Sequence, residues 1–116
     1  MPFSKLGLSA SITDAVKALG YEKPTSIQQK AIPIVLRGSN LIAAAQTGTG
    51  KTASFVLPIL EKLSQGETQR KKRARAIILT PTRELALQVH QSIENIFLHH
   101  LARTVLLIMF LFLRLA

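Results

Sequence analysis

The sequence contains no cysteine and no tryptophan, and it is poor in acidic residues. Without cysteine, a disulfide framework, a thiolate zinc site and a thiol nucleophile are all excluded, as is typical of a protein from a reducing compartment such as the cytoplasm. Six acidic side chains, of which Asp14 is the only aspartate, face fifteen basic ones and give a formal charge of +9. This imbalance indicates either a polyanionic partner or charge that serves solubility.

Long hydrophobic runs are also missing. The most apolar stretch, Val105 to Leu113, has nine residues, whereas a membrane-spanning helix needs about 20. The N-terminal segment lacks the unbroken apolar core of a signal peptide. The sequence therefore predicts neither secretion nor a membrane partner.

Apolar residues recur at helical spacing in four segments, each with a start or stop signal. We expect helices from Ser9 or Ser11 to Leu19, from Thr25 or Ser26 to about Arg37, and over 51–63 and 83–95. Proline lacks an N–H and crowds the preceding turn, so Pro33 is expected to cap, kink or divide the second helix. Pro58 argues against an unbroken third helix for the same reason.

Two short apolar segments, 40–45 and 76–80, have the character of buried strands. Residues 103–110 are either a third strand or a disordered apolar tail. Strands that alternate with helices predict an α/β fold in which helices flank a parallel sheet.

The strongest chemical signal is the segment AQTGTGKT over residues 45–52. Small residues let backbone N–H groups approach phosphate oxygens, and the following helix adds the positive end of its dipole. Lys51 is suited to the β- and γ-phosphates and the Thr52 hydroxyl to Mg²⁺. Ala45 stands where the general motif has glycine, but it is small enough to preserve this chemistry. The segment therefore predicts a phosphate-binding loop.

Three motifs together resemble the DEAD-box ATP-dependent RNA helicases, with the RhlE-like bacterial subgroup as the nearest variety. Residues 20–28, GYEKPTSIQ, are similar to the Q motif, and Phe3 lies seventeen residues before Gly20, where the family has an isolated aromatic residue. Residues 45–52 resemble motif I, which commonly opens with alanine, and residues 81–86, PTRELA, resemble motif Ia. The resemblance implies the first part of a RecA-like P-loop NTPase domain.

The resemblance assigns roles to the nucleotide-binding residues. Tyr21 is expected to stack on adenine, and Gln28 to bond its edge, because an amide offers a donor and an acceptor side by side. Without the resemblance, Tyr21 is as well explained as a core aromatic and Gln28 as a surface residue. The loop around ATP and Mg²⁺ is expected to comprise Gln46, Thr47, Gly48, Thr49, Gly50, Lys51 and Thr52, with Thr52 on the metal.

The resemblance also implies an RNA contact. Thr82 and Arg83 are expected to touch the sugar–phosphate backbone, although by sequence alone Arg83 is an ordinary exposed arginine in a first helical turn. The basic run 70–75 is as well explained by a solvated loop.

The resemblance ends near residue 96. We therefore divide the chain into residues 1–96, the N-terminal part of a truncated RecA-like domain, and residues 97–116, an atypical hydrophobic tail whose composition suggests a frameshift. No Asp-Glu-Ala-Asp segment follows, and no second domain, on which hydrolysis in this family depends. The expected function is an N-terminal helicase fragment that binds ATP–Mg and RNA and is inactive by itself. The alternative is a non-catalytic nucleotide-binding, RNA-binding or interaction fragment.

Overall fold

The computed structural model describes residues 2–46, 50–65, 76–99 and 108–112. A short 3₁₀ helix, η1 (Phe3–Leu6), opens the chain, and four α-helices and two β-strands follow. In chain order these are α1 (Ala10–Ala18), α2 (Ser26–Leu36), α3 (Lys51–Gln65), β1 (Ala76–Thr80), α4 (Arg83–His99) and β2 (Ile108–Phe112).

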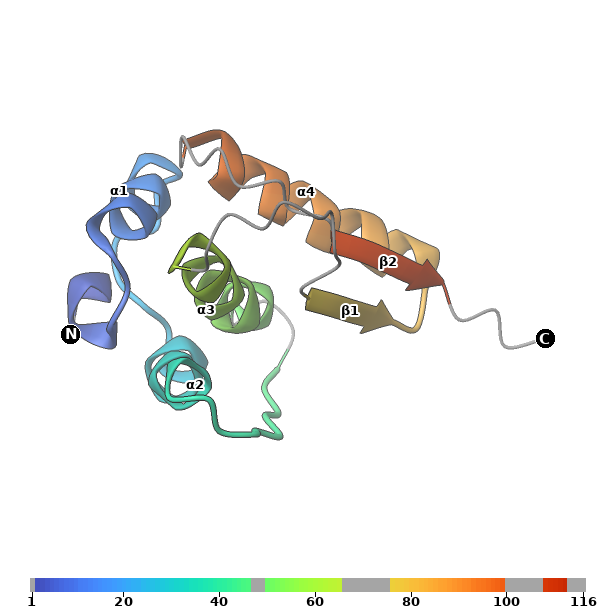
Figure 1. The fold of residues 1–116 in the computed structure, drawn as a ribbon, viewed down its shortest axis with the longest axis horizontal. Helices are drawn as coiled ribbons and strands as arrows, with labels where there is room; N and C mark the ends of the chain where they lie inside the picture. The colour runs from blue at the N-terminus through green and yellow to red at the C-terminus, as the bar shows by residue number, and fades with distance from the viewer. Residues whose placement is uncertain (1, 47–49, 66–75, 100–107, 113–116) are drawn as a thin grey trace.

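Helix α3 lies at the centre, with α1, α2 and α4 around it (Figure 1). Its apolar side chains recur every three to four residues, so one broad stripe of the helix faces its neighbours. Most of the buried core comes from this stripe and from the facing side chains of the other helices. The core includes Ile12, Val16, Ile32, Val56, Leu57, Leu60, Val89 and Ile93.

The two internal prolines do not divide their helices, contrary to expectation. Helix α2 continues through Pro33, whose carbonyl accepts a hydrogen bond from the Arg37 N–H at 3.2 Å. Helix α3 continues through Pro58, which is almost fully buried. Each proline removes only one backbone hydrogen bond. Burial of the apolar faces of α2 and α3 against each other offsets that loss, so tertiary packing overrides the local preference.

Strands β1 and β2 pair in parallel, from Ala76 opposite Ile108 to Thr80 opposite Phe112. The strand expected over 76–80 is confirmed, and the third strand is displaced towards the C-terminus relative to the expected 103–110. Helix α4 runs beside both strands (Figure 1). Ile78 is buried whereas Ile77 and Leu79 are exposed, so the described helices cover one face of the pair.

The strand expected over 40–45 is wrong. Residues 40–46 have no regular secondary structure, and the Ile42 side chain is 100 % exposed. A buried strand needs hydrogen-bonding neighbours within a sheet, and in the described part of the chain β1 pairs with β2 instead. The apolar composition of this segment was therefore insufficient to place it.

Helix α4 extends past the expected end at Asn95, to His99.

Among the helices within the described ranges, none combines the length and the apolar character that crossing a membrane requires.

Leu57 and Leu87 provide a matched test of this packing, because Leu57 is 1 % and Leu87 58 % exposed. We expect Leu57→Ala to lower the free energy of unfolding by about 2–5 kcal/mol through lost burial and a residual cavity. Leu87→Ala, which removes the same atoms from a solvated face, should change it by less than about 0.5 kcal/mol. Chemical denaturation followed by circular dichroism measures both. Equal losses would contradict the central position of α3.

Candidate functional site

The amino-terminal end of α3 is built as a helix terminus that can receive an anion. Gly50 precedes the helix with φ +81°, and its carbonyl accepts the Ser54 N–H at 3.2 Å. Lys51 is exposed and Thr52 is half-buried in the first turn. The first N–H groups of a helix have no partner within it and carry the positive end of the dipole. The predicted loop residues Thr47, Gly48 and Thr49 lie outside the described residues, and Gln46 is exposed.

Gln28 joins the loop before α2 to the start of α3. Its side-chain oxygen accepts the Thr25 N–H at 2.9 Å, as in a capping box, and its Nε2 donates to the Gly50 carbonyl at 3.1 Å. Gln28 is only 1 % exposed. Gln28 is therefore not a surface residue, and in this conformation its side chain is not accessible to a nucleobase. Its amide instead links the loop before α2 to the start of α3.

Gly50 has to be glycine at this junction. A Cβ added to it would lie 2.3 Å from Gln28 Nε2 and 3.3 Å from the Thr25 hydroxyl oxygen. Its positive φ is also one that residues with a side chain rarely adopt. The atoms that crowd this glycine are those of Gln28 and Thr25, and the close approach of phosphate oxygens to it stays a prediction.

The Thr25 hydroxyl oxygen is buried beside Gly50 and makes no well-formed hydrogen bond among the described residues. In the capping box this oxygen faces the Gln28 N–H. The crowded glycine and the open end of α3 together fit a polar ligand that interacts with this junction.

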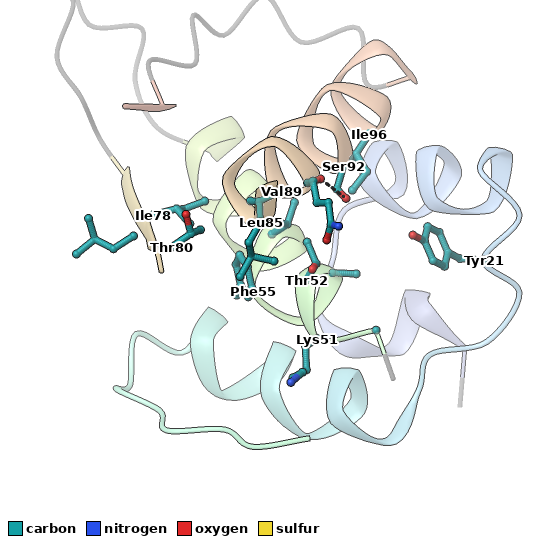
Figure 2. A pocket seen from close by; sticks show the side chains of 15 residues that line it. Tyr21, Lys51, Thr52, Phe55, Ile78, Thr80, Leu85, Val89, Ser92 and Ile96 are labelled. Carbon is teal, nitrogen blue, oxygen red and sulfur yellow. Dashed lines mark hydrogen bonds between the residues drawn. The ribbon is translucent and has the colours of Figure 1, made fainter. Parts of the chain in front are cut away.

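An open cavity of about 650 Å³ adjoins the same end of α3. Tyr21, 44 % exposed, lines it from the loop before α2, together with Gly50, Lys51 and Thr52 (Figure 2). The structure thus brings four of the predicted residues to one cavity, while Gln28 lies behind Gly50. The rest of the wall is mainly apolar and comes from α3, β1 and α4, including Phe55, Val56, Ile78, Leu85, Val89 and Ile96.

Three polar residues of the cavity wall, Thr80, Gln88 and Ser92, were not predicted from the sequence. Thr80 ends β1, and the ends of parallel strands commonly face ligands, so its position was the available signal. Gln88 and Ser92 lie one helical turn apart in α4, and the Ser92 hydroxyl donates to the Gln88 carbonyl at 3.1 Å (Figure 2).

Thr82 and Arg83 lie where β1 passes into α4, and neither lines the cavity. The Thr82 hydroxyl accepts the Leu85 N–H at 3.1 Å, so it caps α4. Both residues are exposed. They are therefore accessible to a large partner, separately from the four residues that share the cavity.

Within the described ranges, no group of three or more histidine or acidic side chains comes together in a way that could hold a metal ion. Thr52 is the predicted metal contact, and this half-buried residue lines the cavity beside Lys51. A single hydroxyl fits a Mg²⁺ ion whose other ligands are phosphate oxygens and water.

Gly50 and Gly20 form a matched pair that isolates the crowding at the loop. Both have positive φ, +81° and +92°, but a Cβ added to Gly20 meets nothing within 4 Å. Gly20→Ala should cost about 1–2 kcal/mol for its backbone conformation alone. We expect Gly50→Ala to cost clearly more in chemical denaturation, because it also breaks the Gln28 bond. Equal costs would show that the close approach to Gln28 does not exist in solution.

Comparison with known proteins explains this combination of residues. The sequence profile of the DEAD/DEAH box helicases matches residues 25–109, well over half of the chain and past the boundary drawn at residue 96. The chain is 46 % identical over 103 residues to the DEAD-box ATP-dependent RNA helicase RhpA of Helicobacter pylori, covering 89 % of this chain and 20 % of that protein. It is 50 % identical over 96 residues to the ATP-dependent RNA helicase CshA of Limosilactobacillus reuteri, covering 83 % and 18 %. The chain thus spans about a fifth of the length of these curated relatives.

Solved structures agree. The fold is similar to the RNA helicase Prp28 of Chaetomium thermophilum bound to ADP, with a TM-score of 0.77 and 39 % identity over 84 % of this chain and 24 % of that one. It is also similar to a DEAD box protein of Methanococcus jannaschii, with a TM-score of 0.72 and 47 % identity over 83 % and 25 %. The match covers part of the RecA-like domain of these proteins. The chain belongs to the DEAD-box ATP-dependent RNA helicases and corresponds to their N-terminal region.

Proposed function

We propose that this chain binds ATP with Mg²⁺ at the amino-terminal end of α3 and contacts the RNA backbone through Thr82 and Arg83. The observation that carries the proposal is the convergence of Tyr21 with Gly50, Lys51 and Thr52 on one cavity. Tyr21 lies about 30 positions before the other three residues, so only a folded chain brings its aromatic ring to a helix terminus that can bind phosphates. One solved relative is described as bound to ADP.

The phosphate end uses charge and backbone dipoles. Lys51 supplies a positive charge for the β- and γ-phosphates, and the helix N–H groups behind it donate to oxygens. Thr52 would offer its hydroxyl to Mg²⁺, which would neutralise part of the phosphate charge. Gln46, Thr47, Gly48 and Thr49 complete the proposed loop.

The base end uses stacking and one amide. The exposed part of the Tyr21 ring offers a face for adenine. Gln28 already uses one acceptor site on Thr25 and one N–H on Gly50, and an amide has one further site of each kind. These remaining sites are buried with the rest of Gln28, so we propose that adenine reaches them only when the junction at Gly50 opens, which would link base binding to the conformation of that junction.

Several finer assignments rest on the same resemblance. We propose that the chain comes from an RhlE-like, cytoplasmic helicase and that residues 1–96 form its RecA-like part, with 97–116 as a distinct hydrophobic tail. We propose ATP hydrolysis and RNA unwinding only for a protein as long as the curated relatives, of which this chain spans about a fifth. The described residues that line the cavity include no carboxylate, so none of them is assigned to activating water. The same observation favours the alternative of nucleotide or RNA binding without turnover.

Nucleotide binding is tested by calorimetry with ATP, GTP and Mg²⁺. We expect ATP to bind more tightly than GTP, and Lys51→Ala to weaken ATP binding about 10- to 100-fold, the loss of one charge-assisted contact. Lys62→Ala removes an exposed lysine from the same helix and should leave the affinity unchanged. Equal affinities for ATP and GTP would contradict the proposed roles of Tyr21 and Gln28. Unchanged ATP affinity in the Lys51→Ala variant would contradict the proposed phosphate site.

RNA binding is tested by fluorescence anisotropy with a labelled single strand at several salt concentrations. Arg83→Ala should weaken binding and lower the slope of log affinity against log salt by about one, because one phosphate contact is lost. Arg37→Ala, an exposed arginine after α2, is the control. If both variants behave alike, the positive charge of the whole chain binds RNA and the assignment of Arg83 fails.

A further inference from the structure

Glu61 is a buried carboxylate that the proposed nucleotide site does not use. It lies in α3, is 1 % exposed, and its Oε2 accepts hydrogen bonds from both the N–H and the hydroxyl of Ser9, at 3.0 and 2.8 Å. Fifty-two residues separate the two partners. The sequence feature that points to this role is an acidic residue on the apolar stripe of a helix, one turn after the buried Leu57. Burying a carboxylate costs free energy, and its hydrogen bonds to Ser9 offset part of that cost while they hold the two segments together.

The Glu61 carboxylate sits at the amino-terminal end of α1. Ser9 is the residue before that helix, and its side chain makes no capping hydrogen bond to the helix but donates to Glu61. A negative charge at a helix N-terminus is favoured by the helix dipole. The side chain that normally caps a helix locally is thus used to attach α1 to α3.

The other end of α1 is tied firmly to Tyr21. The Gly20 N–H donates to the Lys17 carbonyl at 3.0 Å, and the Tyr21 N–H donates to the Val16 carbonyl at 3.2 Å. With the positive φ of Gly20, these two bonds form a Schellman motif, which fixes the backbone of Tyr21 to the last turn of α1. A displacement of α1 therefore moves Tyr21 with it.

The lengths of the two helices fit this arrangement. At 1.5 Å per residue the nine residues of α1 span about 13 Å, and the ten steps from Lys51 to Glu61 along α3 span about 15 Å. Ser9, at the start of α1, is held ten residues along α3 from Lys51, and the length of α1 is comparable to that separation. Tyr21 accordingly shares its cavity with Lys51 and Thr52 (Figure 2).

We propose that Glu61 is a positioning residue for recognition of the base: by holding Ser9 it sets the position of α1, and through α1 that of the Tyr21 ring beside the phosphate-binding end of α3. This inference rests on the proposed nucleotide site. Glu61 touches no nucleotide itself, so it affects the affinity for adenine and leaves the affinity for phosphates unchanged.

The sequence provides its own probe, because Tyr21 is the only tyrosine and tryptophan is absent. Tyrosine fluorescence of the full chain thus reports on Tyr21 alone, with or without nucleotide. The experiment compares wild type, Glu61→Ala and Glu61→Gln by acrylamide quenching of this fluorescence, and by the affinities for ATP and for inorganic tripolyphosphate, each with Mg²⁺. The glutamine variant keeps an oxygen that can accept both Ser9 bonds.

We expect Glu61→Ala to make Tyr21 more accessible to acrylamide and to weaken ATP binding about tenfold, while tripolyphosphate affinity stays within about twofold of wild type. Glu61→Gln should restore most of both values. Leu63→Ala, which removes a buried side chain from the same helix, is the control for a general loss of stability and should leave quenching and both affinities unchanged. If Glu61→Ala does not fold, Ser9→Ala removes only the hydroxyl bond and should act in the same direction with a smaller effect.

An equal loss of ATP and tripolyphosphate affinity in Glu61→Ala, or unchanged quenching of Tyr21, overturns the proposal. If wild type binds neither ligand, the proposed function fails, and quenching still decides whether Glu61 positions Tyr21. If wild type binds ATP and Glu61→Ala binds it equally well, the nucleotide site stands and the role of Glu61 is wrong.

Discussion

The burial of α3 is the constraint on which the rest of the described structure depends. Helices α1, α2 and α4 all pack against it, and its side chains supply a large part of the core. Because the apolar stripe of α3 fixes how it can rotate, its first turn is held in one orientation. Lys51 and Thr52 therefore face the cavity as a consequence of packing further along the same helix.

Two polar junctions then locate the neighbouring segments on this helix. At its start, Gln28 bonds the Gly50 carbonyl and brings α2 close to the first turn of α3. Ten residues along, Glu61 bonds Ser9 and attaches α1. Buried hydrogen bonds specify position more sharply than apolar contacts, which tolerate small shifts. The two ends of the proposed nucleotide site, ring and loop, are thus placed by polar contacts on an apolar framework.

Several elements followed from the sequence because their signals are local. The capping box at Thr25, the glycine after α1 and the apolar period of α3 fix the starts, stops and faces of helices within a few residues. The proposed phosphate loop likewise rests on a local signal, since its chemistry depends on residues adjacent in sequence. Strands were less predictable: 76–80 formed as expected, but the equally apolar 40–45 did not, because a strand exists only through its neighbours.

By itself the sequence determined the helices and, through three ordered motifs, the helicase family. Each of these depends on residue type and spacing along the chain. Only the tertiary structure decided that Gln28 bonds Gly50, that Tyr21 and Lys51 share a cavity, and that Glu61 holds Ser9. Those contacts join segments 22 to 52 residues apart, and no local pattern encodes which of many polar groups will meet once the helices pack.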